Sequence, residues 1–94
     1  MRVEKTDRYS AWLGGLKDHA GRARILMRVH RLIHGNPGQH RDLTDGVSAL
    51  KIDVGPGYRV YDTVWGSILL LLVGGDKSTR QKDIAKAIQL AKQF

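Results

Sequence analysis

Cysteine is absent from this chain of 94 residues, which excludes disulfide bonds and cysteine-based zinc sites. Long apolar runs are absent too, because the longest, residues 68–73, is far shorter than the ~20 residues that a membrane-spanning helix needs. The charged residues at the N-terminus are not followed by the apolar stretch of a signal peptide. We therefore expect a cytoplasmic protein.

Acidic residues are scarce, with 9 Asp and Glu against 16 Lys and Arg, so the net charge is +7. Such an excess indicates a polyanionic partner, which can be a nucleic acid, an acidic protein or an anionic membrane. The positive charge is concentrated between Lys17 and Arg41, where six basic residues accompany a single acid. All four histidines lie in the same stretch: His19, His30, His34 and His40. A well-solvated basic surface is the alternative to a binding surface.

The chain has the length of one domain, residues 1–94, and contains neither a linker nor an internal repeat. Residues 2–6 alternate weakly and predict an edge strand. A first helix follows, with Thr6 or Asp7 as its cap. Its apolar side chains recur at i, i+3, i+4 and i+7: Tyr9, Trp12, Leu13 and Leu16.

Asp18 is a favourable N-cap for a second helix over about residues 19–34, which Gly35 ends. The two helices are joined by almost no connector, so we expect an antiparallel helical hairpin. One face of the second helix carries a basic stripe at i, i+4 and i+7: Arg24, Arg28 and Arg31. Residues 35–46 are interpreted as a polar loop.

Three strands are predicted after this loop, over residues 47–53, 58–64 and 68–73. Gly55-Pro56-Gly57 supplies the turn between the first two strands, and Gly74-Gly75 is expected to end the third. Ser78 and Gln81 have the spacing of a capping box for a last helix. The predicted fold class is therefore α+β, in the order β-α-α-β-β-β-α, with an N-terminal helical hairpin packed on a small antiparallel sheet and a C-terminal helix.

Strand alternation gives the sharpest indication of a site. If Leu50 and Val60 face the core, the residues on either side of them face away from it. Three such residues then share one exposed face of a hairpin: Lys51, Arg59 and Tyr61. Two cations beside an aromatic ring suit a nucleic acid, because the cations neutralise phosphates and the ring stacks on a base. An ordinary solvated sheet face is the alternative.

Two other patterns carry less weight. Residues 74–78 lie between a strand and a helix but lack the glycines of a phosphate-binding loop, which argues against nucleotide hydrolysis. The start of that helix, with Lys77 beside it, could still hold one phosphate of an RNA. His30 and His34 have a zinc-binding spacing but no third ligand, so we expect neither a metal nor a cofactor.

Short motifs follow one another along nearly the whole chain: Trp12-Leu13, Leu16-Lys17-Asp18, Arg24-Ile25, Gly35-Asn36-Pro37-Gly38, Gly46-Val47-Ser48, Gly55-Pro56-Gly57-Tyr58-Arg59-Val60-Tyr61, Gly74-Gly75-Asp76-Lys77-Ser78-Thr79 and Asp83-Ile84. In this order the motifs strongly resemble the RelE/HigB-like toxins of bacterial type II toxin–antitoxin modules, in the subgroup called addiction module killer proteins. The two longest motifs are specific when they occur together at this distance.

The resemblance implies a RelE-like fold and a metal-independent endoribonuclease that cuts mRNA, usually on the ribosome. It also implies a neutralising antitoxin, often a helix-turn-helix DNA-binding protein, and no membrane partner. Carried over by position, the catalytic residues are Arg59, Lys51, Tyr61 and Lys77. The cations expected to bind the remainder of the RNA are Arg24, Arg28, Arg31, Arg41, His40 and Arg80.

The chain departs from the subgroup after Gly46-Val47-Ser48. Where the subgroup has Glu-Leu-Arg, this chain has Ala49-Leu50-Lys51. Lysine keeps the charge but lacks the two-pronged guanidinium that fits a phosphate, and Ala49 removes a carboxylate from the expected active face. A catalytically weak protein that binds RNA, the ribosome or an antitoxin without cutting is therefore the alternative function.

Overall fold

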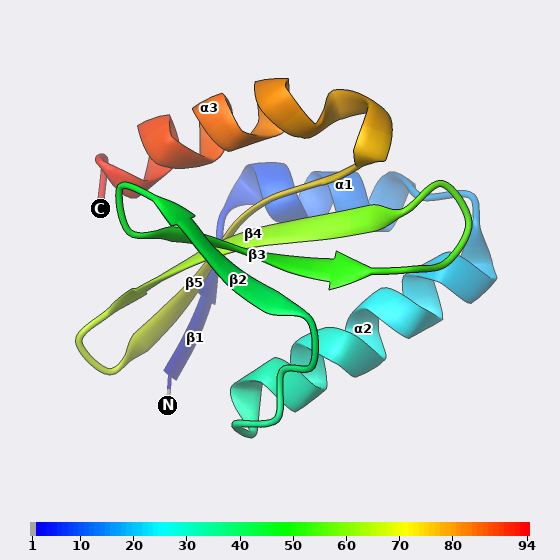
Figure 1. Ribbon diagram of the computed structural model, residues 1–94, viewed down its shortest axis with the longest axis horizontal. Helices are drawn as coiled ribbons and strands as arrows, with labels where there is room; N and C mark the ends of the chain where they lie inside the picture. The colour runs from blue at the N-terminus through cyan, green and yellow to red at the C-terminus, as the bar shows by residue number, and fades with distance from the viewer. Residues whose placement is uncertain (1) are drawn as a thin grey trace.

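A five-stranded sheet in the order β1-β5-β4-β3-β2 forms the centre of the molecule, with three helices around it (Figure 1). The computed structural model describes residues 2–94. Its elements along the chain are β1 (Arg2–Lys5), α1 (Asp7–Gly15), α2 (His19–Ile33), β2 (His40–Thr44), β3 (Val47–Ile52), β4 (Tyr58–Trp65), β5 (Ile68–Asp76), the 3-10 turn η1 (Lys77–Thr79) and α3 (Arg80–Ala91). The predicted α+β class is confirmed.

The sheet is mixed, and the expectation of a purely antiparallel sheet was wrong. β2, β3, β4 and β5 pair antiparallel in chain order, but β1 pairs in parallel with β5. The two helices between β1 and the hairpins return the chain to the same end of the sheet, which makes a parallel pairing possible. β5 thereby becomes an interior strand, and its residues Leu69–Gly75 are all buried, as its continuous apolar run predicts.

β2 was not predicted, because residues 35–46 were interpreted as a loop. Its sequence His40–Thr44 has one apolar residue and looks polar. Pairing with β3 supplies its hydrogen bonds, with His40 opposite Leu50 and Arg41 opposite Ala49. As an edge strand it needs little apolar surface, so its sequence carries no strong strand pattern.

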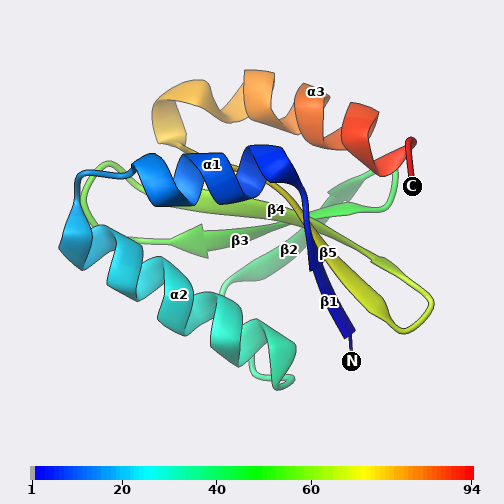
Figure 2. The ribbon, with the colours of Figure 1, turned by 180° about the vertical axis from the view of Figure 1, so that it is seen from behind.

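The two faces of the sheet carry separate cores. α1 and α2 cover one face, around Ile25, Leu50 and Val60, whereas α3 covers the other, around Ala87 and Leu72. In Figure 2, α1 and α2 run in front of the sheet and α3 lies at the top of the view. α1 and α2 run in roughly opposite directions, as expected, but they diverge from their short connection instead of packing along their whole length (Figure 2).

Two of the predicted helix caps are present. The Tyr9 backbone N–H donates to Thr6 Oγ1 at 3.0 Å, and the Gly21 N–H donates to Asp18 Oδ1 at 2.9 Å. The third was wrong, because Asp76 rather than Ser78 begins the turn before α3. None of the helices formed by residues 2–94 has the length and apolar character needed to cross a membrane.

Gly74 and Gly75 were expected to end β5, and this expectation was wrong. The strand continues through both glycines to Asp76. A side chain at Gly74 would overlap the indole ring of Trp12, and one at Gly75 would overlap the Asp83 carboxylate. Adjacent strand residues face opposite sides of the sheet, so the glycines let α1 and α3 reach the β5 backbone from both faces.

We expect Gly74→Ala to lower the free energy of unfolding by about 3 kcal/mol or more, because its methyl group displaces the Trp12 ring from a packed layer. Gly14→Ala is the matched control, since the space at Gly14 is open and α1 gains a better helix former. It should raise the free energy by about 0.5–1 kcal/mol. Urea unfolding of the two variants measures both effects, and equal stabilities would contradict the packing described.

Candidate functional site

A groove with a volume of about 320 Å³ opens on the α3 side of the sheet, between the start of α3 and strands β2 and β3. Four cations surround it, and we call it the cationic groove: Arg41, Lys51, Arg59 and Arg80. Its other lining residues are Gly38, Gln39, His40, Leu43 and Ala49. Among residues 2–94, no carboxylate lines this groove, so its lining is predominantly positive.

Lys51 and Arg59 lie directly opposite each other on β3 and β4, so the predicted pairing of these two cations is confirmed. The Arg59 guanidinium is half-buried, and its Nη1 donates to the Gly57 carbonyl oxygen at 2.8 Å. The Lys51 ammonium is exposed and lies 3.7 Å from Asp53 Oδ1. Arg59 is thus fixed by the hairpin turn, whereas Lys51 is held only by a weak surface ion pair.

Tyr61 does not lie in the exposed face with them, so that expectation was wrong. Its exposed fraction is 0%, and it packs in the core beneath α3. Its hydroxyl is buried without a hydrogen-bond partner among residues 2–94. Burial, followed by the charge of Asp83, raises the pKa of Tyr61. The ring therefore cannot stack on a base. Strand alternation gave its face correctly but could not show that α3 covers it.

Arg41 and Arg80 join the hairpin cations from distant parts of the chain. Arg41 lies on the edge strand β2 opposite Ala49, and Arg80 is the first residue of α3. Both side chains are exposed. Lys77 is not among the residues that line the groove. It lies beside the groove, because both Lys77 and Arg59 are next to Gly57.

The predicted phosphate site at the start of the last helix is already occupied by a carboxylate. Asp76 Oδ1 accepts from the Ser78 backbone N–H at 2.8 Å and from the Ser78 hydroxyl. Hydrogen bonds from the Ser78 side chain and backbone lower the pKa of Asp76, so its negative charge stays there. Asp76 thus caps the turn, and its negative charge disfavours a phosphate at the same position.

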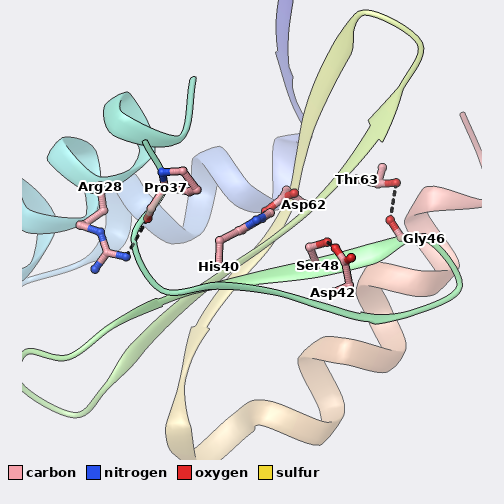
Figure 3. Close-up of polar contacts among 8 residues, drawn as sticks. All are labelled: Arg28, Pro37, His40, Asp42, Gly46, Ser48, Asp62 and Thr63. Carbon is pink, nitrogen blue, oxygen red and sulfur yellow. Dashed lines mark hydrogen bonds and ion pairs between the residues drawn. The ribbon is translucent and has the colours of Figure 1, made fainter. Parts of the chain in front are cut away.

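The basic stripe of α2 lies over the opposite face of the sheet from the cationic groove. Arg24 and Arg31 are exposed, and Arg28 Nη2 donates to the Pro37 carbonyl at 3.0 Å (Figure 3). Arg28 therefore fixes the loop that brings Gly38 to the groove. None of the three arginines lines the groove, although the Arg28 guanidinium lies next to Gly38, which does.

His40 also turns its ring away from the groove, in contrast to its expected role. Figure 3 shows the ring directed at Asp62, with His40 Nε2 at 2.9 Å from Asp62 Oδ2. Next to this pair, the Ser48 hydroxyl donates to Asp42 at 2.8 Å. His40 lies opposite Leu50, so its ring shares the face of α1 and α2, whereas Arg41 points to the groove.

The Asp62 carboxylate and the His40 imidazole each shift the pKa of the other. The hydrogen bond with Asp62 is the largest effect, and it raises the pKa of His40. Burial raises the pKa of Asp62 more than His40 lowers it, because Asp62 is 1% exposed and its Oδ1 has no partner among residues 2–94.

The rings of His30 and His34 lie 4.3 Å apart on α2, as their spacing implies. Within residues 2–94, no third histidine or acidic side chain joins them to form a group that could hold a metal ion.

A larger pocket of about 480 Å³ lies on the same face, at the other end of α3. Its walls include the exposed rings of Trp65 and Phe94, together with Ile68 and Leu70. Glu4, Lys5, Asp45 and Lys92 also line it, so charges of both signs balance. This pocket therefore does not select for an anion as the cationic groove does.

Gln39, Leu43 and Asp62 were not among the residues expected from the sequence, although the first two line the groove and the third binds His40. Recognition of β2 as a strand would have placed Leu43 beside Arg41 on one face and His40 on the other.

Comparison with known proteins gives one informative match. An uncharacterized protein of Haemophilus influenzae is 42% identical over 95 residues, which cover 100% of this chain and 96% of the relative. No model of a known protein family matches the chain.

We expect Tyr61→Phe to keep or raise the free energy of unfolding, by up to about 1 kcal/mol, because it removes a buried hydroxyl that has no partner. Its affinity for polyanions should not change, since the ring lies beneath α3. Thermal unfolding and anion titration of the variant measure the two quantities. A large loss of either would show that the hydroxyl has a partner or a ligand.

The His40–Asp62 pair should make stability depend on pH. A His40 pKa raised above its ordinary ~6.5 stabilises the folded state fully below that pH, and this contribution is lost as the pH rises through the raised pKa. The free energy of unfolding, measured in urea from pH 6 to 9, should therefore fall more in the wild type than in Asp62→Asn. Parallel pH profiles would show that the pair does not carry this linkage.

Proposed function

We propose that this chain, which belongs to the same protein family as the uncharacterized Haemophilus influenzae protein, binds RNA in its cationic groove and cuts it. The observation that carries the proposal is the convergence of four cations on one hollow that no carboxylate lines. Phosphates are the anions that such a surface attracts, and binding releases their counterions. The affinity of the groove should therefore fall steeply as the salt concentration rises.

Arg59 is the residue best placed to contact the scissile phosphate. Its Nη1 is held by the Gly57 carbonyl, which leaves its remaining N–H groups to bind phosphoryl oxygens. A preorganised guanidinium loses little conformational freedom when it binds, in contrast to an exposed lysine. Lys51, directly opposite on β3, supplies a second cation to the same phosphate.

The reaction that suits these residues is attack by the ribose 2′-hydroxyl on the adjacent phosphorus. The bond to the 5′ oxygen of the next nucleotide breaks, which leaves a 2′,3′-cyclic phosphate and a free 5′-hydroxyl. Arg59 and Lys51 stabilise the charge that grows on the phosphoryl oxygens. Among residues 2–94, the lining of the groove contains no free histidine ring and no carboxylate, so a group from outside it accepts the 2′-hydroxyl proton. The departing 5′ oxygen takes up a proton from that group or from water.

The resemblance to RelE/HigB-like toxins gives this chemistry a biological setting. In that setting the chain is the toxin of a type II module, with a RelE-like fold, and acts without a metal on mRNA in the cytoplasm. The ribosome then supplies the missing proton acceptor, and a helix-turn-helix antitoxin neutralises the toxin. The α+β class, with an N-terminal helix pair and a C-terminal helix, agrees with this proposal.

A second function, binding without cutting, is favoured by the surroundings of Ala49. Ala49 lies between Arg41 and Tyr61 in the sheet and places no carboxylate beside the cations. Lys51 lies 3.7 Å from Asp53, which competes with a phosphate for the ammonium group. In this alternative function the protein binds RNA or the ribosome without cutting the RNA.

We expect Arg59→Ala to lower the rate of mRNA cleavage by about 10²–10³-fold, the usual effect of removing one preorganised charge-stabilising donor. Its free energy of unfolding should fall by about 1 kcal/mol, because the variant loses the hydrogen bond to the Gly57 carbonyl, and the fold should stay intact. Purified protein is added to mRNA with and without translating ribosomes, and the new ends are mapped by primer extension. Lys17→Ala removes an exposed cation outside the groove, so it is the matched control and should cut normally.

Discrete ends that require Arg59 but not Lys17 support the endoribonuclease. Binding of RNA by the wild type without new ends in either reaction supports the second function. A wild-type protein that neither binds nor cuts RNA would refute both.

A further inference from the structure

Two apolar residues line the cationic groove together with its four cations. Leu43 and Ala49, both half-buried, are its apolar lining residues. Ala49 lies opposite Arg41 on β2, and Lys51 follows two residues later on the same face. The methyl group of Ala49 leaves space beside these longer side chains. Leu43 and Ala49 also pack against the core beneath α3, which fixes them as apolar parts of the groove wall.

We propose that this hollow holds one unstacked nucleobase of a single-stranded RNA, with the neighbouring phosphates on the surrounding cations. The proposal rests on RNA binding by the groove, and it adds that the groove recognises a base as well as a charge. A volume of about 320 Å³ is near the lower end of the ~300–1,000 Å³ that small-molecule sites occupy, which suits a single nucleotide. A base that is paired and stacked in a double helix cannot enter, so the site selects single strands.

The surroundings fit a flat, partly polar ring. Leu43 and Ala49 provide apolar contact to the face of the base, which favours no particular base. Gln39 stands at the rim, and its Nε2 donates to Asp53 Oδ2 at 3.3 Å. With its amide nitrogen directed to Asp53, the Gln39 carbonyl oxygen is left to accept a hydrogen bond from the edge of the base.

The test separates recognition of a base from recognition of a charge. A six-nucleotide 2′-O-methyl RNA, which cannot be cut by its own 2′-hydroxyl, is compared with inorganic polyphosphate of equal charge, which has no bases. Ala49→Leu fills the hollow without changing the charge of the protein. It should weaken RNA binding by about tenfold, because the base loses its apolar contact with the groove, and leave polyphosphate binding unchanged.

Two further variants guard against a general effect of the substitution. Leu43→Ala enlarges the hollow instead of filling it, and it too should weaken the RNA complex selectively. Ala85→Leu adds the same side chain at an exposed position of α3 outside the groove and should bind both ligands normally. Arg59→Ala should lower the affinity for RNA and for polyphosphate alike.

The proposal is overturned if Ala49→Leu and Leu43→Ala bind the RNA as tightly as the wild type does, or if they lose RNA and polyphosphate to the same extent. RNA binding by the wild type with either of these results would leave the proposed function intact and remove only the base site. A wild type that binds polyphosphate but not RNA would remove both.

Discussion

Two adjacent glycines in β5 allow helices on both faces of the sheet to touch the same stretch of backbone, and the rest of the structure depends on this contact. The Trp12 ring from α1 occupies the space over Gly74, and the Asp83 carboxylate from α3 occupies the space over Gly75. Because α3 meets β5 at a fixed point, its first residue, Arg80, is held beside the hairpin. The position of one wall of the cationic groove therefore follows from the absence of a side chain in a buried strand.

The groove places like charges close together, which disfavours the folded state by self-repulsion. The fold limits this cost by leaving most of the cations in solvent and by bonding Arg59 to a backbone carbonyl instead of a carboxylate. A carbonyl orients the guanidinium without neutralising its charge. A polyanion in the groove would relieve the repulsion. The same clustering of cations therefore attracts such a ligand and lowers the stability of the free protein.

The edge strand β2 contributes side chains to both faces of the sheet, because its residues alternate between the two faces. Arg41 and Leu43 belong to the groove, whereas His40 attaches the strand to Asp62 of β4 on the other face (Figure 3). An edge strand with so little apolar surface gains from such polar attachments, because only one of its sides is paired. The same residues that hold β2 in place therefore fix the position of Arg41.

The sequence by itself determined the local structure: the caps at Thr6 and Asp18, the Gly55-Pro56-Gly57 hairpin, the buried run of β5 and the pairing of Lys51 with Arg59. These features depend on near neighbours or on a two-residue period. Tertiary structure decided the parallel place of β1, the strand β2, the burial of Tyr61 and the face of His40. Alternation assigns a residue to a face, but which face a distant helix covers depends on long-range packing, which has no local period.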